Sequence, residues 1–382
     1  MENRNLQIPG YVPAKKAVIA KPFQETMFSY EDSQFHQFRF YGLASEYFGI
    51  WVSNISLNIM TFGIYSAWAK VRRKRYFYGN TELNGYRFDY HAKGWQILIG
   101  RIITFIILTV YSALSHLSSA LAFAMLIFTL CLAPYLIMRG IRFNARVTSY
   151  RNVCFDFTGG YGGAFLAFIA GPILSVLSLT MLQPVATRWQ HTYLYDNLKY
   201  GSGSFKVNIK LPSLYGALLK CSLVVIPGLI IIAIFIFTMM RFRLEAGYQN
   251  YANTDPRNAP IAMLSLGFYV FFYAWLLIIF AVYRALIRNI VLSSVVFNDT
   301  DPMESDVDIT HYFWILLSNI ILTILTFSLM RPWCAIRISR YLCEHTAIRF
   351  SGEWKNFYKE NEEEGSAVGS EYIDFEGVDF GF

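Results

Sequence analysis

Charged residues are scarce in this 382-residue chain, where Lys, Arg, Asp and Glu make up 15% of the sequence while 55% is hydrophobic and 18% aromatic. A soluble domain has about a quarter of its residues charged. The block from Ile102 to Met138 has none of the four charged types in 37 positions. As one helix it would be roughly 55 Å long, against roughly 30 Å of bilayer hydrocarbon. It therefore folds back as two spans, near 95–115 and 117–138, and an ordinary soluble protein is excluded.

The sequence also lacks the motifs of several enzyme classes. It contains no Walker phosphate loop, no H-E-x-x-H and no G-x-S-x-G, and its six histidines are scattered. Its five cysteines show no C-x-x-C and no metal spacing, so we expect free thiols. The spans contain no Asp or Glu, the usual mark of proton or cation coupling. We therefore expect no enzyme, no catalytic residue, no metal and no cofactor; an enzyme acting on lipid ranks a distant third among the functions below.

Five further apolar stretches follow or precede this pair. Leu214 to Met240 and Ile261 to Tyr283 have the length of spans. Residues 47–66, 163–182 and 312–330 are also about 20 residues long, and we name these three the opening segments. Residues 1 to 46 contain no apolar run of signal-peptide length, so the first membrane segment is expected to direct insertion.

An internal repeat relates these segments. Shifting the chain by 265 positions places Tyr47-Phe48 on Tyr312-Phe313, Trp68 on Trp333, and Arg75-Tyr76 on Arg340-Tyr341. A shift of 117 gives a fainter match, which places Tyr76 on Tyr193. The predicted fold is an all-α polytopic membrane protein with small flanking β-elements and about seven apolar segments in internal repeats. Its divisions are a polar segment (1–34), repeat 1 (35–150), repeat 2 (151–294), a partial repeat 3 (295–358) and an acidic disordered tail (359–382).

Short segments beside the apolar ones alternate apolar with polar residues, as strands do. They are Phe35 to Tyr41, Tyr86 to Tyr90, Val153 to Phe157 and Phe205 to Ile209. We expect them to pair into small cytoplasmic β-elements that clamp each repeat.

The stretch from Thr61 to Arg72 reads T-F-G-I-Y-S-A-W-A-K-V-R, preceded by Phe40-Tyr41-Gly42 and followed by Arg75-Tyr76 and Phe88-Asp89-Tyr90. In these residues the chain resembles the YjgN-like family of bacterial inner-membrane proteins, over most of its length. The family typically has Pro before the Trp, where this chain has Ala67 and its third copy has Pro332. The resemblance implies a bacterial inner-membrane location and an unassigned activity, with no substrate or catalytic residue to carry over.

The distribution of basic residues can be used to choose between two topologies, because short loops rich in Lys and Arg stay in the cytoplasm. If all seven apolar stretches span the membrane, 20 basic residues lie inside and 11 outside. If the opening segments enter and leave on the same face, 28 lie inside and 3 outside. Gly171-Pro172 in the second opening segment also favours a broken segment. Against this, each opening segment is long enough to span, and inverted three-span repeats are common in transporters. The charge bias favours the same-face topology, with the C-terminus cytoplasmic.

Basic and aromatic residues follow the first opening segment and recur after the third. As candidates for binding lipid head groups we take Lys70, Arg72, Arg73, Arg75, Arg337 and Arg340. The candidate interfacial aromatic residues are Trp68, Tyr76, Trp333 and Tyr341. In the functional interpretation these residues grip anionic lipid, whereas in the simpler one the charges only keep the loop in the cytoplasm.

Asn54, Asn58 and Asn319 are polar residues inside opening segments. Asn54 and Asn58 stand four apart, on one helical face, and Asn319 repeats the first. They could line a polar path, although hydrogen bonding between helices is the more ordinary use of an amide in a membrane.

These features leave two main functions open. One is a transporter or channel-like protein for a small solute; the other is a lipid-binding or envelope-organising membrane protein without transport activity. Transport requires a continuous polar cavity, whereas lipid binding requires only a lateral groove. We expect membrane lipids, anionic ones above all, as partners, and no nucleic acid.

Overall fold

The computed structural model describes residues 35–245 and 259–349. The predicted N-terminal polar segment and acidic tail lie outside these residues. The strands are β1 (Phe35–Gln37), β2 (Arg39–Phe40), β3 (Thr81–Leu83), β4 (Tyr86–Tyr90), β5 (Thr148–Tyr150), β6 (Val153–Phe157), β7 (Leu198–Tyr200), β8 (Gly203–Val207), β9 (Val295–Phe297), β10 (Asp301–Ser305) and β11 (Thr346–Arg349). The helices are α1 (Ala44–Met60), α2 (Ser66–Gly79), α3 (Gly94–Leu117), α4 (Ser119–Arg146), α5 (Tyr161–Phe165), the π-helical turn η1 (Leu166–Ala170), α6 (Gly171–Leu177), α7 (Gln183–Asp196), α8 (Leu211–Glu245), α9 (Ala259–Leu292), α10 (Ile309–Leu325) and α11 (Arg331–Glu344).

All eleven strands belong to one antiparallel sheet, in the order β1-β11-β10-β9-β8-β7-β6-β5-β4-β3-β2. The two ends of this order, β1 and β2, are consecutive in the chain and separated only by Phe38, so the sheet closes into a barrel-like ring. Tight turns join neighbouring strands, and Asn84-Gly85 and Arg151-Asn152 adopt the positive φ angles that two-residue hairpin turns require.

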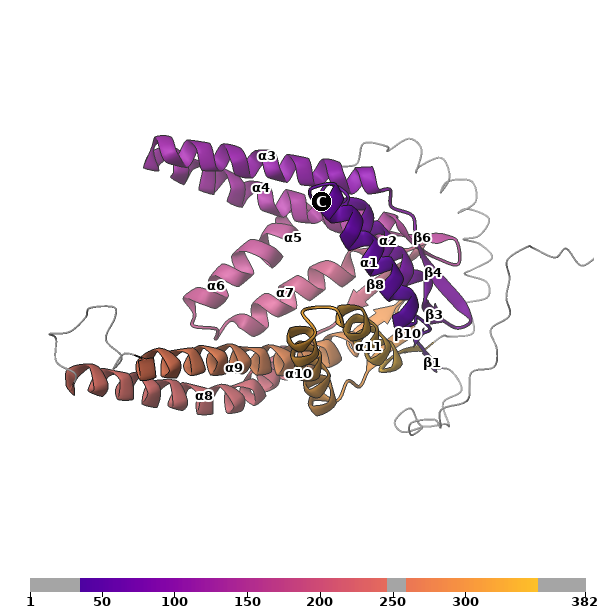
Figure 1. The fold of residues 1–382 in the computed structure, drawn as a ribbon. Helices are drawn as coiled ribbons and strands as arrows, with labels where there is room; N and C mark the ends of the chain where they lie inside the picture. Colours follow the sequence, from indigo (N-terminus) through magenta and orange to yellow (C-terminus); the bar gives the residue numbers. More distant parts are fainter. Residues whose placement is uncertain (1–34, 246–258, 350–382) are drawn as a thin grey trace, which may run out of the picture.

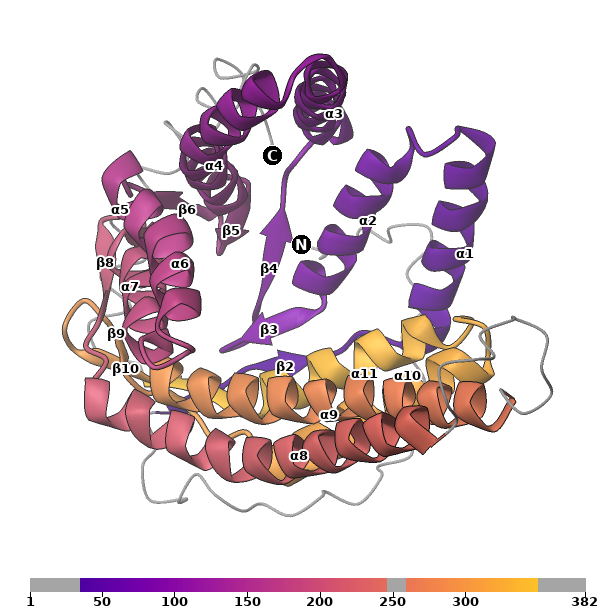
Figure 2. The same cartoon turned by 90° about the vertical axis from the view of Figure 1, so that its left-hand side faces the viewer.

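Helices connect the remaining strand pairs as five helical hairpins, which we number in chain order. Hairpin 1 is α1 and α2, hairpin 2 is α3 and α4, hairpin 3 is α5 to α7, hairpin 4 is α8 and α9, and hairpin 5 is α10 and α11. Each hairpin begins and ends at the sheet, and all five project from the same side of it (Figure 1). Viewed from that side, they stand in a circle (Figure 2).

Hairpins 2 and 4 are the long ones and contain the candidate membrane spans. Four helical segments are long and apolar enough to cross a bilayer: Gly94–Leu114, Ser119–Arg146, Leu211–Arg241 and Trp275–Leu292. They lie in α3, α4, α8 and α9, which are the helices that contain the four expected spans. The two long hairpins lie on opposite sides of the circle (Figure 2).

The opening segments form hairpins 1, 3 and 5, which are shorter. Tyr161–Leu177 and Ile309–Leu325 are apolar but below the length of a span. In each, the return helix brings the chain back to the sheet, so both ends lie on the same side, as the charge distribution predicts. The tips expose apolar side chains, with Phe62 98%, Leu179 84% and Phe327 93% exposed. Such tips are suited to lipid rather than water.

The three short hairpins are held by the same hydrogen bonds, at the two offsets found in the sequence. The hydroxyls of Tyr76, Tyr193 and Tyr341 donate to the main-chain carbonyls of Leu43, Gly160 and Asp308, at 2.9, 3.1 and 3.2 Å. At the tips, the hydroxyls of Thr61, Ser178 and Thr326 accept from the N–H four residues later, at 3.0, 2.9 and 3.2 Å.

Aromatic side chains fill the sheet ring. The buried core cluster there consists of Leu83, Tyr150, Val153, Tyr200, Phe297 and Ile348, and Phe38, Phe88, Phe155, Phe205 and Met303 pack against it. Ring centroids lie 4.7 Å apart for Phe88 and Tyr150 and 4.8 Å apart for Phe205 and Phe297. This cluster, named the aromatic core below, closes the sheet end of the molecule.

The prediction of small separate β-elements was wrong in extent. The four segments with alternating residues do form strands or overlap them, but the strands join across the predicted repeat boundaries into one sheet, as when β5 pairs with β6 and β8 with β9. Each strand has two to five residues. Such short strands carry too little pattern to reveal their partners, which the helical hairpins determine by bringing their own ends together.

Candidate binding sites on the membrane side of the sheet

A cavity of about 810 Å³ lies between the return helices of hairpins 3, 4 and 5. We name it the α7–α9–α11 cavity. Its lining residues are Phe38, Gln183, Thr187, Gln190, His191, Tyr195, Phe280, Tyr283, Arg284, Ile287, Arg288, Val291, Leu292, Leu342, Cys343 and Thr346. Polar groups come mostly from α7 and apolar groups mostly from α9. The lining is therefore amphipathic.

The charge of this cavity is positive. Arg284, Arg288 and His191 line it, and none of its lining residues is Asp or Glu. Arg288 donates to the carbonyl of Leu342 at 3.1 Å and to the hydroxyl of Thr346 at 2.7 Å, which holds α9 against α11. Arg284 is exposed, with its guanidinium 5.7 Å from the Phe280 ring centroid. A free cationic group beside an apolar wall fits an anionic amphiphile.

His191 is the titratable group of the α7 wall. Its Nδ1 is buried without a hydrogen-bond partner among the described residues, and its ring stacks on Tyr195 with centroids 6.3 Å apart. Burial lowers the pKa of His191, because the apolar surroundings disfavour the charged imidazolium. The free protein therefore presents a neutral imidazole with an unsatisfied nitrogen.

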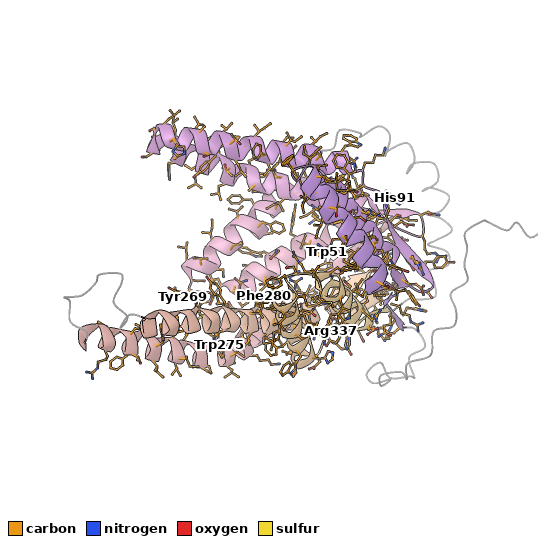
Figure 3. The ribbon with its side chains drawn as sticks, in the orientation of Figure 1. Trp51, His91, Tyr269, Trp275, Phe280 and Arg337 are labelled. Atoms are coloured by element: carbon orange, nitrogen blue, oxygen red, sulfur yellow. The ribbon has the colours of Figure 1, made fainter. Side chains whose placement is uncertain are left out.

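The cavity does not continue through the sheet. Phe38, one of its lining residues, also packs against the aromatic core that fills the ring. Figure 3 shows Phe280 beside this region, nearer the sheet than Tyr269 on the same helix. A ligand would therefore reach the cavity from the membrane side.

A second pocket, of about 420 Å³, lies where hairpin 5 meets hairpin 1. We name it the seam pocket. Ala44, His311, Ile315, Trp333, Ile336, Arg337, Arg340, Tyr341 and Glu344 line it. It shares no lining residue with the α7–α9–α11 cavity.

The sequence-predicted basic residues divide into two groups. Arg337 and Arg340 come together with Trp333 and Tyr341 in the seam pocket. Lys70, Arg72, Arg73 and Arg75 lie on α2, with Trp68 and Tyr76 on the same helix. Lys70 is half-buried, while Arg72, Arg73 and Arg75 are exposed on the surface of that helix and line neither pocket.

Two of these arginines also have a structural role. Arg75 donates to the carbonyl of Tyr90 at 3.3 Å and Arg340 to the carbonyl of Gly42 at 3.2 Å. Each joins a return helix to the chain segment that leads into a hairpin, since Tyr90 ends β4 before α3 and Gly42 lies between β2 and α1.

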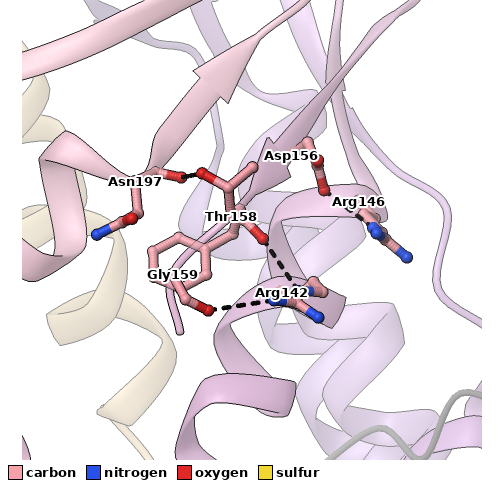
Figure 4. A network of polar contacts seen from close by, with 7 residues as sticks. Arg142, Arg146, Asp156, Thr158, Gly159 and Asn197 are labelled. Carbon is pink, nitrogen blue, oxygen red and sulfur yellow. Dashed lines mark hydrogen bonds and ion pairs between the residues drawn. The ribbon is translucent and has the colours of Figure 1, made fainter. Parts of the chain in front are cut away.

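Hairpin 2 is joined to the end of β6 by the same kind of contact. Arg142 donates to the carbonyls of Phe157 and Gly159 at 3.0 and 3.1 Å, and Arg146 pairs with Asp156 at 2.9 Å (Figure 4). The network fixes the junction between hairpins 2 and 3.

Cations also gather between α2 and α3. Burial, and then the neighbouring charge of Lys70, lower the pKa of Lys74 to about 8. Burial, and then the charge of Arg101, lower the pKa of Lys70 in turn. The Lys74 ammonium is held by the Asn144 side chain and lies 5.0 Å from the Tyr90 ring centroid.

The predicted intramembrane amides lie in hairpins 1 and 5 and line neither pocket. Asn319 donates from its side chain to the carbonyl of Cys334 at 3.3 Å, a contact between α10 and α11. The side-chain oxygens of Asn54, Asn58 and Asn319 are buried and have no hydrogen-bond partner among the described residues. For Asn319 the structure thus shows the ordinary, helix-joining use of an amide.

Sequence reasoning missed the α7–α9–α11 cavity. Arg284 and Arg288 stand four apart, hence on one helical face, directly after an apolar span, and that spacing was a usable signal. The residues that α7 contributes gave no such signal. Gln183, Thr187 and His191 form a polar face like that of any exposed helix, and only the ring arrangement brings them beside α9.

These features define a class: a helical membrane protein with two hairpins long and apolar enough to cross a membrane, mounted on a closed sheet with a basic, amphipathic cavity. A bacterial family of unknown function, DUF898, matches residues 35–375, and the chain belongs to this family. Over 363 residues it is 23% identical to the inner membrane protein YjgN of Salmonella typhimurium, covering 84% of this chain and 90% of that protein. It is 32% identical over 156 residues to YjgN of Escherichia coli K12, covering 40% and 39% of the two chains. The resemblance to the YjgN-like family is thus confirmed. No solved structure matches the chain.

Proposed function

We propose that this protein resides in the bacterial inner membrane and binds an anionic lipid, with the lipid head group in the α7–α9–α11 cavity. The observation that carries the proposal is the lining of this cavity, where Arg284, Arg288 and His191 stand beside apolar residues of α9 without any carboxylate. Cationic groups next to an apolar wall match a phosphate that bears acyl chains.

The arrangement of the spans favours lipid binding over conduction along the ring axis. In an apolar 18-residue stretch of each of the four spans, only 11%, 11%, 6% and 28% of the residues are buried inside the protein. The two long hairpins stand on opposite sides of the circle, with short hairpins between them, and the aromatic core fills the axis at the sheet. A solute-filled pore needs membrane-spanning walls on all sides, whereas lipid binding needs only a lateral groove.

Transport of a small solute remains the second candidate, because the α7 wall supplies Gln183, Thr187 and Gln190 as polar groups. A transporter for an anionic solute would use the same arginines. It would also have to displace the aromatic core during each cycle, since Phe38 lies between the cavity and the opposite face.

We place the sheet on the cytoplasmic side, with the C-terminus. All five hairpins return to the sheet, and most of the basic residues lie near it, which is the side that the positive-inside rule makes cytoplasmic. We also infer that hairpins 1, 3 and 5 derive from one repeated unit. The aligned hydrogen bonds of Tyr76, Tyr193 and Tyr341 support this inference.

Lipid binding to the purified full chain in mild detergent tests the proposal. Native mass spectrometry would measure the dissociation constants of phosphatidylglycerol and phosphatidylcholine. We expect the anionic lipid to bind more tightly than phosphatidylcholine. Arg284→Gln should lower the affinity for the anionic lipid about tenfold, which corresponds to the loss of one charge-assisted hydrogen bond.

Arg241→Gln is the matched control, because Arg241 lies on α8 outside the cavity. It should leave the affinity unchanged. Equal weakening by Arg241→Gln and Arg284→Gln would show that net charge alone attracts the lipid and would contradict a site. Solute flux into lipid-filled vesicles that is lost in Arg284→Gln would support transport instead.

A further inference from the structure

The seam pocket carries an ordered row of functional groups along one face of α11. Trp333, Arg337, Arg340 and Glu344 follow one another at spacings of four, three and four residues, which places them on one face of the helix. Trp333 lies near the hairpin tip, and Glu344 ends the helix at the sheet. The row therefore begins with an aromatic ring on the membrane side and ends with a carboxylate on the aqueous side.

Both arginines are held by hydrogen bonds, and among the described residues neither pairs with a carboxylate. Arg337 donates to the Ser318 hydroxyl at 2.6 Å and lies 5.2 Å from the Trp333 ring centroid. Arg340 donates one hydrogen bond to the Gly42 carbonyl. A guanidinium has five N–H donors, so both retain donors for a ligand. In the part of the chain that the structure describes, the Glu344 carboxylate forms no ion pair with either arginine.

This order matches the order of groups in one kind of phospholipid. We propose that the seam pocket binds a zwitterionic phospholipid whose head group carries a primary amine beyond its phosphate, as in phosphatidylethanolamine. The acyl chains lie toward Ile315 and Trp333, the phosphate accepts hydrogen bonds from Arg337 and Arg340, and the ammonium donates to Glu344. Arg340 and Glu344 are about 6 Å apart along the helix, one turn, which suits the two-carbon link between phosphate and amine.

Glu344 is the residue that sets the head-group selectivity. A carboxylate beside the phosphate site repels a lipid whose only charge is the phosphate, so it disfavours phosphatidylglycerol. The carboxylate stabilises the ammonium of ethanolamine by accepting hydrogen bonds from its N–H groups. The quaternary nitrogen of choline has no N–H group to donate. The inference goes beyond the anionic-lipid site proposed above and uses different residues.

Hairpin 1 provides an internal comparison. At the offset of 265, Arg72 and Arg75 stand where Arg337 and Arg340 do, but Gly79 stands where Glu344 does. The α2 face therefore has the two cations without the carboxylate. An amine-selective site is expected in hairpin 5 and not in hairpin 1.

Native mass spectrometry of the full chain, with phosphatidylethanolamine, phosphatidylcholine and phosphatidylglycerol at equal concentrations, tests the proposal. We expect the wild-type protein to bind the ethanolamine lipid at least fivefold more tightly than the choline lipid. Glu344→Gln should reduce this ratio to below twofold while leaving phosphatidylglycerol binding at the α7–α9–α11 cavity intact. Arg337→Gln should weaken the binding of the ethanolamine lipid. Arg72→Gln, the matched control, should leave this binding unchanged.

An unchanged ratio in Glu344→Gln would overturn the proposal, as would equal effects of Arg72→Gln and Arg337→Gln. Soluble phosphoethanolamine serves as a separate probe: binding as tight as that of the lipid would overturn a membrane source for the ligand. Loss of phosphatidylglycerol binding in Arg284→Gln with an unchanged ethanolamine preference would show that the two sites are independent. Thermal unfolding of each variant confirms that it is folded.

Discussion

The Tyr341 hydroxyl makes two hydrogen bonds to one residue: it accepts from the main-chain N–H of Asp308 at 3.0 Å and donates to the carbonyl of Asp308 at 3.2 Å. Tyr76 makes the same pair of contacts with Leu43, both at 2.9 Å. Asp308 directly precedes α10, and Leu43 directly precedes α1. One phenol thus ties the return helix to the start of the opening helix.

Replacing this hydroxyl gives the first prediction. Tyr341→Phe keeps the ring but leaves the Asp308 N–H and carbonyl without this partner, at a cost of about 1–2 kcal/mol. We expect a lower midpoint of thermal unfolding in detergent. Tyr273→Phe is the control, because the Tyr273 side chain on α9 is 67% exposed. An equal midpoint for both variants would contradict a structural role for Tyr341.

The packing of the long hairpin 4 depends on a missing side chain. A Cβ at Gly228 on α8 would lie 1.9 Å from Nε1 of Trp275 on α9, whereas a Cβ at Gly216 on the same helix would meet nothing within 4 Å. Gly228→Ala therefore forces the two helices apart, and we expect a loss of about 1–3 kcal/mol. Gly216→Ala should be neutral or slightly stabilising, because alanine favours the helix.

Thermal unfolding with tryptophan fluorescence as readout measures both glycine variants. The Trp275 signal should change in the folded state of Gly228→Ala only. If both variants unfold like the wild type, α8 and α9 do not pack through this contact.

The sequence predicted the membrane part better than the sheet for a physical reason. A span needs only length and low charge, properties that Ile102 to Met138 shows locally. The offset of 265 also aligns Tyr76 with Tyr341 in the sequence, and the two hydroxyls make the same contact. The closure of β1 and β2 onto opposite edges, by contrast, depends on the path of the whole ring.

The pairing of Arg146 with Asp156 predicts a response to acid. Burial alone would raise the pKa of Asp156, but the hydrogen bonds from Arg146 and the Phe157 main chain, together with the charges of Arg146 and Arg142, outweigh it and hold the pKa below its usual value of 3.8. The folded state therefore retains the carboxylate to lower pH than the unfolded state does. The stabilisation is present above about pH 4 and is lost as the pH falls below that value.

Unfolding midpoints at pH 3 to 6 test this prediction. Asp156→Asn should flatten the acid dependence relative to the wild type. Asp299→Asn is the control, because its pair with Lys206 is largely exposed, with side chains 66% and 60% accessible, and such pairs contribute little. If the acid dependence of the unfolding midpoint were flattened more by Asp299→Asn than by Asp156→Asn, the Arg146–Asp156 pair would not be its cause.

Only part of each pocket could be predicted from the sequence. Trp333, Arg337, Arg340 and Tyr341 share a helix, so local spacing grouped them correctly. Glu344 lies on the same helical face, yet an acidic residue at a helix end carries no recognisable pattern. The α7–α9–α11 cavity collects its residues from three helices that are distant in the sequence, and no local pattern reports such a meeting.

Lipid binding in that cavity should depend on pH through His191. Burial lowers the pKa of the free imidazole below 6.5. A bound phosphate stabilises the imidazolium and raises that pKa, so binding takes up a proton. The affinity for phosphatidylglycerol should therefore rise as the pH falls from about 7.5 to 5.5. His191→Gln should remove this dependence and keep the binding at pH 7.5. A wild-type affinity that does not vary with pH, or a His191→Gln variant that retains the full pH dependence, would show that His191 does not contact the bound phosphate.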